Sequence, residues 1–267
     1  MAHAQIASFP RLAKENTPPT RVLAGQKTLL SRTMHDIRYD AIHDEFVVNN
    51  PFAYAVLVFA GGSSGEVPPK RVIQGPKTQL GSSSRLEVDP VNNEILVPEG
   101  GRVLVFEREA NGDVAPKRIL NNTGSGGGIA VDPLHNLLIL GSGGNNRNPG
   151  AIRIYDRTAS GDTPPLRMIK GPRSGIIRAL QMQVVPSTGW IAVTQPGESG
   201  TFDPGGTFVG FWSINDNGDV PPRFRLSGPK STLIKPRGVG LIPQHKEVIV
   251  ADMSLNSVLV YYFPEIF

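Results

Sequence analysis

The chain has 267 residues and a net charge of only +4, and nowhere do more than two Lys or Arg residues adjoin. A nucleic-acid interface is therefore not expected, because such interfaces concentrate basic residues on one surface. The sequence has no cysteine, which excludes disulfides, thiol catalysis and Cys-based metal sites. No apolar run reaches the roughly 18 residues that a membrane span requires.

A short motif recurs along the chain. Pro-Pro-x-Arg begins at Pro18, Pro68 and Pro164, a variant begins at Ala115, and a drifted copy begins at Pro221. Successive copies are roughly 50 residues apart, and each interval holds four short apolar runs separated by turn residues. A four-strand repeat of this length predicts a β-propeller. We therefore expect an all-β, five-bladed propeller of four-stranded antiparallel blades, with six blades as the alternative.

The strands of each repeat can be aligned in chain order. The inner strands are expected at 36–40, 85–89, 128–132, 181–185 and 238–242. The second strands are almost wholly apolar, which is typical of strands covered on both faces, and are expected at 46–48, 95–97, 138–140, 191–193 and 248–250. The third strands, with aromatic ends, are expected at 56–59, 103–106, 152–155, 209–212 and 258–261.

Two recurring polar positions have structural interpretations. Asp89 and Asp132 precede proline at the end of an inner strand, so their carboxylates are expected to accept backbone N–H groups of the following turn. The Arg after Pro-Pro opens the outer strand. We expect it at the rim of the blade, where its aliphatic stem would cover apolar surface.

The repeat resembles the bacterial NHL-type propeller repeats. The resemblance rests on Pro-Pro-x-Arg-x-Ile-x-Gly, on Val-Asp-Pro at 88–90, on Glu-Ile-Leu-Val at 94–97 and on Val-Leu-Val-Phe at 103–106, and it covers almost the whole chain. It implies a propeller fold, and it implies export, since many such proteins are exported. It does not identify an activity, because propellers include enzymes, binding proteins and scaffolds.

The two ends of the chain suggest how the propeller closes. An outer strand at 20–25 comes before any inner strand, and the chain ends on a third strand, so 20–25 is expected to complete the last blade. The sequence contains 21 expected strands, whereas five four-stranded blades hold only 20. Residues 5–9 are the strand left over. We expect 5–9 to lie along a blade edge or to mediate self-association. The predicted division is an arm at 1–17 and a propeller at 18–267.

The segment Ala2-His3-Ala4 resembles the small-x-small end of a signal peptide. Together with the family resemblance, it leads us to expect a secreted or periplasmic protein. The alternative is that Met1 is an ordinary translation start and that the N-terminal residues after it are unstructured.

Polar residues alternate with apolar ones along the inner strands and are expected to line the central channel. These candidate binding residues are Asp36, Arg38, Arg85, Glu87, Gln181 and Gln183. Asp36 with Arg85, and Arg38 with Glu87, are complementary in charge across neighbouring blades. The alternative interpretation is a water-filled channel whose charges only neutralise one another.

A second set of oxygen-bearing residues follows the second strands, one in each repeat. Its candidate metal ligands are Asn50, Glu99, Gln195 and Asp252, with Ser142 at the remaining position. Oxygen ligands suit calcium or another divalent cation, and lactonase-type propellers hold a metal with Glu, Asn and Asp from comparable places. The alternative is that polar residues stand there because a strand ends.

No nucleophile motif is present: the sequence has neither Gly-x-Ser-x-Gly nor His-Glu-x-x-His. The sequence therefore favours an exported module that binds an unidentified protein or small molecule at the channel mouth, without a cofactor. The alternatives are a metal-dependent lactonase-like hydrolase and, third, an RNA-binding NHL-type propeller.

Overall fold

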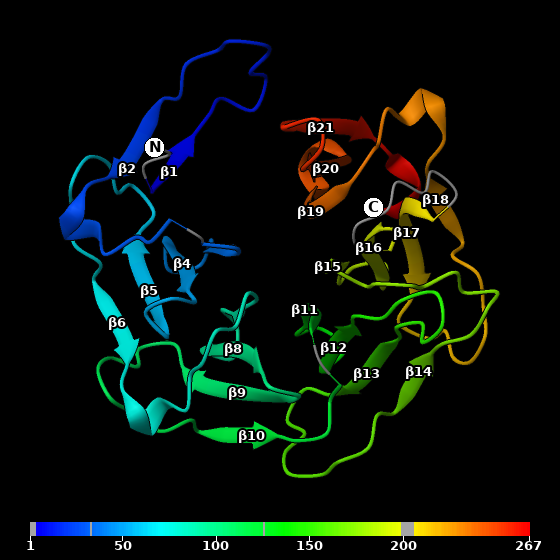
Figure 1. Cartoon of the computed structure of the whole chain (residues 1–267), viewed down its shortest axis with the longest axis horizontal. Coiled ribbons are helices and arrows are strands. Elements are labelled where there is room, and N and C mark those ends of the chain that lie inside the picture. The colour runs from blue at the N-terminus through cyan, green and yellow to red at the C-terminus, as the bar shows by residue number, and fades with distance from the viewer. Residues whose placement is uncertain (1–3, 33, 125, 199–205) are drawn as a thin grey trace. The chain divides into compact units, whose positions relative to one another are not determined.

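The computed structural model describes residues 4–32, 34–124, 126–198 and 206–267. Over these ranges the chain is the expected all-β, five-bladed propeller with antiparallel, mainly four-stranded sheets (Figure 1). It divides into two compact units, Met1–Ile119 and Leu120–Phe267. Most of the predicted export segment at 2–4 lies outside the described residues. No helix in the described ranges is long and apolar enough to cross a membrane.

The first unit contains a two-stranded sheet followed by two four-stranded sheets. Its strands are β1 (Gln5–Ser8) and β2 (Arg21–Ala24), then β3 (Ile37–Asp40), β4 (Glu45–Asn50), β5 (Ala55–Ala60) and β6 (Arg71–Gln74), then β7 (Glu87–Asp89), β8 (Glu94–Glu99), β9 (Arg102–Glu107) and β10 (Arg118–Leu120). The 3-10 turns η1 (Gln26–Thr28) and η2 (Pro76–Thr78) follow β2 and β6.

The second unit contains two four-stranded sheets and a final sheet of three strands. Its strands are β11 (Gly126–Asp132), β12 (Leu137–Ser142), β13 (Ile152–Asp156) and β14 (Arg167–Ile169), then β15 (Gln181–Val185), β16 (Trp190–Pro196), β17 (Thr207–Ser213) and β18 (Phe224–Leu226), then β19 (Pro236–Ile242), β20 (Glu247–Asp252) and β21 (Ser257–Tyr262). The remaining 3-10 turns are η3 (Pro229–Ser231), η4 (Pro243–His245) and η5 (Pro264–Ile266).

The second strand of each sheet lies in the core, as its continuous apolar sequence predicts. Every residue of β4 and β12 is buried, because both faces of these strands are covered. In the first three of these sheets, the turn that precedes the second strand is fixed by an aspartate at the end of the inner strand. Asp89 accepts the N–H of Asn92 at 3.0 Å, and Asp132 accepts the N–H of Leu134 at 3.0 Å, which confirms the structural role predicted for both.

Glycine turns of four sheets bridge to the outer strand that precedes them in the chain. Gly65, Gly112, Gly161 and Gly218 form parallel bridges with Leu23, Ile73, Leu120 and Ile169 of the preceding outer strand. All four glycines have positive φ, between 58° and 78°, which a residue with a Cβ atom rarely adopts. The flanking Asn111 supports one such bridge by accepting the N–H of Val72 at 3.0 Å. The recurring turn glycine is therefore a connector between blades.

The strand expected to be surplus has a partner within the chain. β1 pairs antiparallel with β2, and Ile6 lies opposite Leu23 as Ile152 of a third strand lies opposite Ile169 of an outer strand. β1 and β2 therefore stand in the positions of a third and an outer strand (Figure 1). Residues 5–9 were expected to lie along a blade edge or to mediate self-association; within the chain, this strand is paired along one edge with β2.

In two repeats the arginine of the Pro-Pro-x-Arg motif pairs with a buried glutamate instead of only covering apolar surface at the rim, as the sequence suggested. The guanidinium of Arg71 donates to both carboxylate oxygens of Glu45, at 3.0 Å and 2.5 Å. Arg118 likewise binds Glu94, with Nη2 and Oε2 2.7 Å apart. Both glutamates are buried at the start of a second strand, so the motif supplies the cation that a buried carboxylate requires.

Candidate functional site

Four of the six predicted channel-lining residues meet in one cluster of the first unit. Arg38 donates from Nη1 to Asp36 Oδ1 at 2.6 Å and from Nε to Glu87 Oε1 at 3.0 Å. Asp36 Oδ2 also accepts the N–H of Leu86 at 3.2 Å, on the neighbouring sheet. The positive charge of Arg85 favours the ionised form of Asp36. The charge complementarity expected from the sequence is therefore present, and it links the sheets that contain β3 and β7.

Burial dominates the electrostatics of this cluster. It raises the pKa of Asp36, and the charges of Arg38 and Arg85 oppose that rise. Burial also raises the pKa of Glu87, against the attraction of Arg38. Because the side chains of Asp36, Arg38 and Glu87 are no more than 12% exposed, each carboxylate depends on its arginine partner rather than on water.

Replacing Arg85 with methionine is expected to lower the free energy of unfolding by about 1–3 kcal/mol, because Asp36 then loses one of its two cations. Thermal and urea denaturation measure the change. Lys77→Met, at an exposed position of the same unit, is the matched control and is expected to have little effect. An unchanged melting temperature in Arg85→Met would show that Asp36 does not depend on the charge of Arg85.

Gln181 and Gln183, in the second unit, also connect neighbouring sheets. Gln181 Oε1 accepts the N–H of Val239 at 3.3 Å, and Gln183 Oε1 accepts the N–H of Leu241 at 2.9 Å. Asp36 and Gln181 occupy the same position in their repeats and accept from the same position in the next inner strand. The polar inner-strand residues therefore hold adjacent inner strands together.

The predicted metal ligands each bind the loop that precedes an inner strand. Asp252 Oδ2 accepts the N–H groups of Ile234 and Lys235 at 2.8 Å and 2.7 Å. Gln195 Oε1 accepts the N–H groups of Ile177 and Arg178 at 2.7 Å and 3.1 Å. Glu99 accepts the N–H of Gly81, and Asn50 donates to the carbonyl of Leu29.

These contacts explain why the position is polar in four of the repeats; Ser142, at the same position in the remaining one, bonds instead to the backbone of Ala151. A side-chain acceptor or donor there satisfies backbone groups of a loop that has no strand partner. Within the described ranges, no group of three or more His, Asp or Glu side chains is placed to hold a metal ion. A cation at these residues would have to compete with the loop N–H groups for the same oxygens.

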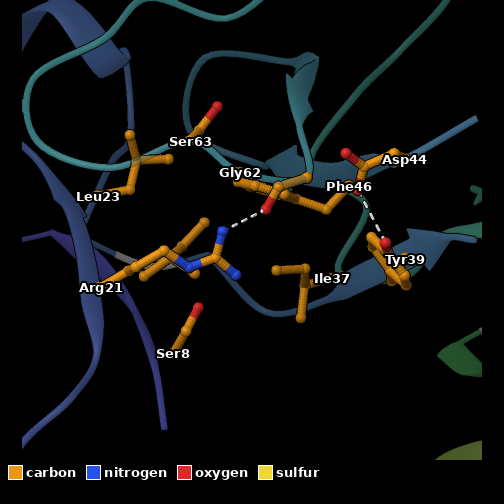
Figure 2. Close-up of a pocket in the computed structure, with 11 residues that line it drawn as sticks. Ser8, Arg21, Leu23, Ile37, Tyr39, Asp44, Phe46, Gly62 and Ser63 are labelled. Atoms are coloured by element: carbon orange, nitrogen blue, oxygen red, sulfur yellow. Dashed lines mark hydrogen bonds between the residues drawn. The ribbon is translucent and has the colours of Figure 1, made fainter.

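A cavity of about 460 Å³ lies in the first unit between the β1–β2 sheet and the sheet that begins with β3. Its apolar wall is formed by Ile6, Leu23, Ile37 and Phe46. Figure 2 shows the polar side chains at its rim. Arg21 donates to the carbonyl of Gly61 at 2.9 Å, and the Tyr39 hydroxyl donates to Asp44 at 2.8 Å. The volume lies in the range of ligand-binding cavities.

The apolar side chains of β3 are exposed at this cavity. Ile37 is 45% exposed and Tyr39 is 61% exposed. The residues equivalent to Ile37 in the other inner strands are at most 6% exposed, namely Leu86, Ile129, Met182 and Val239. Leu86, Met182 and Val239 each pack in a cluster with residues of the preceding sheet, whereas β3 faces only the two strands β1 and β2 within its unit.

One edge of β1 is free within the described part of the first unit. Gly65 donates to the carbonyl of Val22 and accepts the N–H of Ala24, so these β2 residues direct their backbone groups away from β1. Leu23, between them, therefore bonds to Ile6 in the alternating pattern of an antiparallel pair. Gln5 and Ala7 then direct their N–H and C=O groups to the side opposite β2.

Sequence reasoning did not identify this surface. Ile37 and Tyr39 occupy the same repeat positions as core residues of the other inner strands, and the sequence analysis did not distinguish them. The available signal was positional: only two strand-like segments precede the inner strand at 36–40, so fewer strands could cover it.

No family model matches the sequence, and no curated protein is similar to it in sequence. Among solved structures, the chain is similar to Kuenenia stuttgartiensis hydrazine synthase, with a TM-score of 0.60 and 13% identity over 81% of this chain. It spans only 55% of that chain. It is also similar to the WD40 β-propeller domain of Doa1, with a TM-score of 0.58 and 14% identity, over 96% of this chain and 71% of that one. At these identities the likeness shows the β-propeller fold alone.

Proposed function

We propose that this chain is an interaction module of an exported, NHL-type propeller, and that it binds an extended segment of a partner protein along β1. The observation that carries the proposal is the exposed pair Ile37 and Tyr39 beside the free edge of β1. Exposed apolar surface next to an unpaired strand edge is the combination used when proteins recognise peptides by strand addition.

The four-stranded sheets of this chain show which neighbouring strand β1 lacks. In each four-stranded sheet the third strand pairs on one side with an outer strand and on the other with a second strand, as β5 pairs with β6 and β4. β1 has the outer strand but no second strand in its sheet. A segment in that place receives backbone hydrogen bonds from Gln5 and Ala7, and its alternate side chains cover Ile37.

The second strands of this chain define the chemistry of the segment. They are six or seven residues long, extended and apolar at their centres, as in Glu45–Asn50 (Glu-Phe-Val-Val-Asn-Asn). A hexapeptide of that sequence is therefore a suitable probe. Titration calorimetry is expected to show binding of this peptide to the intact protein.

Ala7→Pro tests the strand edge. Proline removes the Ala7 N–H, which points toward the partner segment. The backbone hydrogen bonds of Ile6 and Ser8 to β2 remain, and proline is tolerated in edge strands. It is expected to weaken peptide binding about tenfold. Gln5→Ala keeps every backbone group and is the matched control. The peptide with proline in place of Val48 is expected to bind poorly.

Equal binding by wild type and Ala7→Pro would contradict strand addition, as would no binding of the hexapeptide at all. Sedimentation velocity of the protein alone separates two sources of the segment. Self-association that Ala7→Pro abolishes would identify the partner as a second copy, in accord with the self-association expected for residues 5–9. A monomer that still binds the peptide would indicate a different protein.

A further inference from the structure

The arginine of the Pro-Pro-x-Arg motif and the first residue of the second strand form a recurring pair. In the sheet of β3 to β6, Arg71 Nη2 on the outer strand lies 2.5 Å from Glu45 Oε2 on the second strand. Arg118 and Glu94 form the same pair in the following sheet. Each arginine reaches across the third strand, which lies between the two partners. The pair therefore ties the outer strand of a sheet to its second strand.

The other two complete sheets show that this contact depends on the first residue of the second strand. Phe224 stands at the arginine position of β18 and Trp190 begins β16, and their rings pack edge to face with centroids 5.2 Å apart. Leu137 begins β12, and Arg167 of β14 donates from Nε to the carbonyl of Ile214 in the next sheet at 2.8 Å. The motif arginine therefore turns to a backbone carbonyl where the second strand offers no carboxylate.

Arg21 of β2 is in the same situation as Arg167. The two arginines have the same register on the third strand of their sheets. Arg21 Nη1 donates at 2.9 Å to the carbonyl of Gly61, which is equivalent to the carbonyl that Arg167 uses (Figure 2). Asp44 lines the same cavity, but it accepts the hydroxyl of Tyr39. Among the described residues no carboxylate pairs with Arg21, because its sheet has no second strand.

We propose that Arg21 determines which segment β1 accepts, by pairing with a carboxylate on the first residue of that segment. This inference rests on the strand addition proposed above. Glu45 lies opposite Ala60 of β5, so in the same register the first residue of a segment beside β1 lies opposite Pro10. That residue then stands to Arg21 as Glu45 stands to Arg71, and a glutamate there receives charge-assisted hydrogen bonds.

The surroundings of β2 make this preference depend on one arginine. In the complete sheet, Glu45 binds Lys70 and Arg108 in addition to its motif arginine. The equivalent positions near β2 hold Thr20 and Gly61, which carry no charge. A substitution at position 21 is therefore expected to remove the whole preference for an acidic first residue.

Titration calorimetry with two hexapeptides, both acetylated at the N-terminus and amidated at the C-terminus, tests the pair. One is Glu-Phe-Val-Val-Asn-Asn, and the other has Gln in the first position. The wild type is expected to bind the Gln peptide about fivefold more weakly, as the loss of a partly exposed ion pair predicts. Arg21→Gln is expected to bind both peptides equally, and the four affinities form a double-mutant cycle that isolates the pair. The preference of the wild type is expected to shrink as sodium chloride is added.

Two controls separate a direct contact from general attraction between charges. Lys14→Gln removes one positive charge from an exposed position of the β1–β2 connection and is expected to keep the preference. The peptide Gln-Phe-Val-Val-Asn-Glu carries its carboxylate at the other end and is expected to bind like the Gln peptide. Because Arg21 is exposed, Arg21→Gln is expected to melt close to the wild type, which shows that the variant is folded.

The role of Arg21 and strand addition itself fail in different ways. Equal binding of the Glu and Gln peptides by the wild type, or an unchanged preference in Arg21→Gln, would overturn the role of Arg21 and leave strand addition standing. No binding of either peptide to the wild type would overturn strand addition, and this inference with it. Ala7→Pro is expected to weaken both peptides to the same degree, since it removes a backbone donor and leaves the arginine in place.

Discussion

Glu45→Gln is expected to lower the free energy of unfolding by about 3–5 kcal/mol. Glu45 is 3% exposed and binds three cations: Lys70 at 2.6 Å, Arg71 at 2.5 Å and Arg108 at 2.8 Å. Glutamine has the same shape but no charge, so two largely buried arginines lose their counterion. Urea denaturation measures the change. Glu109→Gln, at a 76% exposed residue that also pairs with Arg108, is the control and is expected to cost less than about 1 kcal/mol.

The loss of stability caused by Glu45→Gln is expected to depend on pH. Burial acts to raise the pKa of Glu45, but hydrogen bonds from Arg71 and Lys70 outweigh it and lower the pKa from 4.5 to about 2. A folded-state pKa below the unfolded value contributes stability above pH 4.5 that is lost as the pH falls toward 2. The difference between wild type and Glu45→Gln should therefore narrow in that window. A difference that stays constant there would contradict the ion-pair account.

Deleting residues 1–26 is expected to destabilise the protein by at least about 4 kcal/mol, whereas deleting residues 1–14 costs about 1–2 kcal/mol. The long deletion removes Leu23, which is 1% exposed and packs in a cluster with Phe46, Leu57 and Phe59. It also removes the bridge between Leu23 and Gly65. The short deletion removes β1, whose residues are exposed or half-buried.

Thermal and urea denaturation of the two truncated proteins measure this difference. Leu12→Ala, at a 70% exposed residue of the β1–β2 connection, is the control for changes in this region and is expected to be neutral. If the short deletion is as damaging as the long one, residues 5–9 are integral to the fold, and a sixth, incomplete blade becomes the better description.

The repeat made the fold predictable because each local signal agreed with the others. Apolar second strands, Asp-Pro turns and turn glycines recur in register, so the strand positions followed from the alignment. The partner of β1 did not follow, because strand pairing depends on the neighbours of a segment rather than on its own sequence.

The candidate sites were less predictable for the same reason. Asp36, Arg38, Arg85 and Glu87 were correctly expected to lie together, since charge complementarity at one repeat position is visible in the sequence. The ion pair of Glu45 with Arg71 spans 26 positions, and its signal was the recurrence of Glu at 45 and 94 with Arg after Pro-Pro.

Amide hydrogen exchange at Ala7, followed by NMR, tests the central claim most directly: β1 is a free edge that receives a partner strand. In dilute protein the Ala7 amide should exchange much faster than that of Ile6, which bonds to β2. Adding the Glu45–Asn50 hexapeptide should slow Ala7 and leave Ile6 unchanged. An Ala7 amide already as protected as Ile6, or one that the peptide does not protect, would contradict the account.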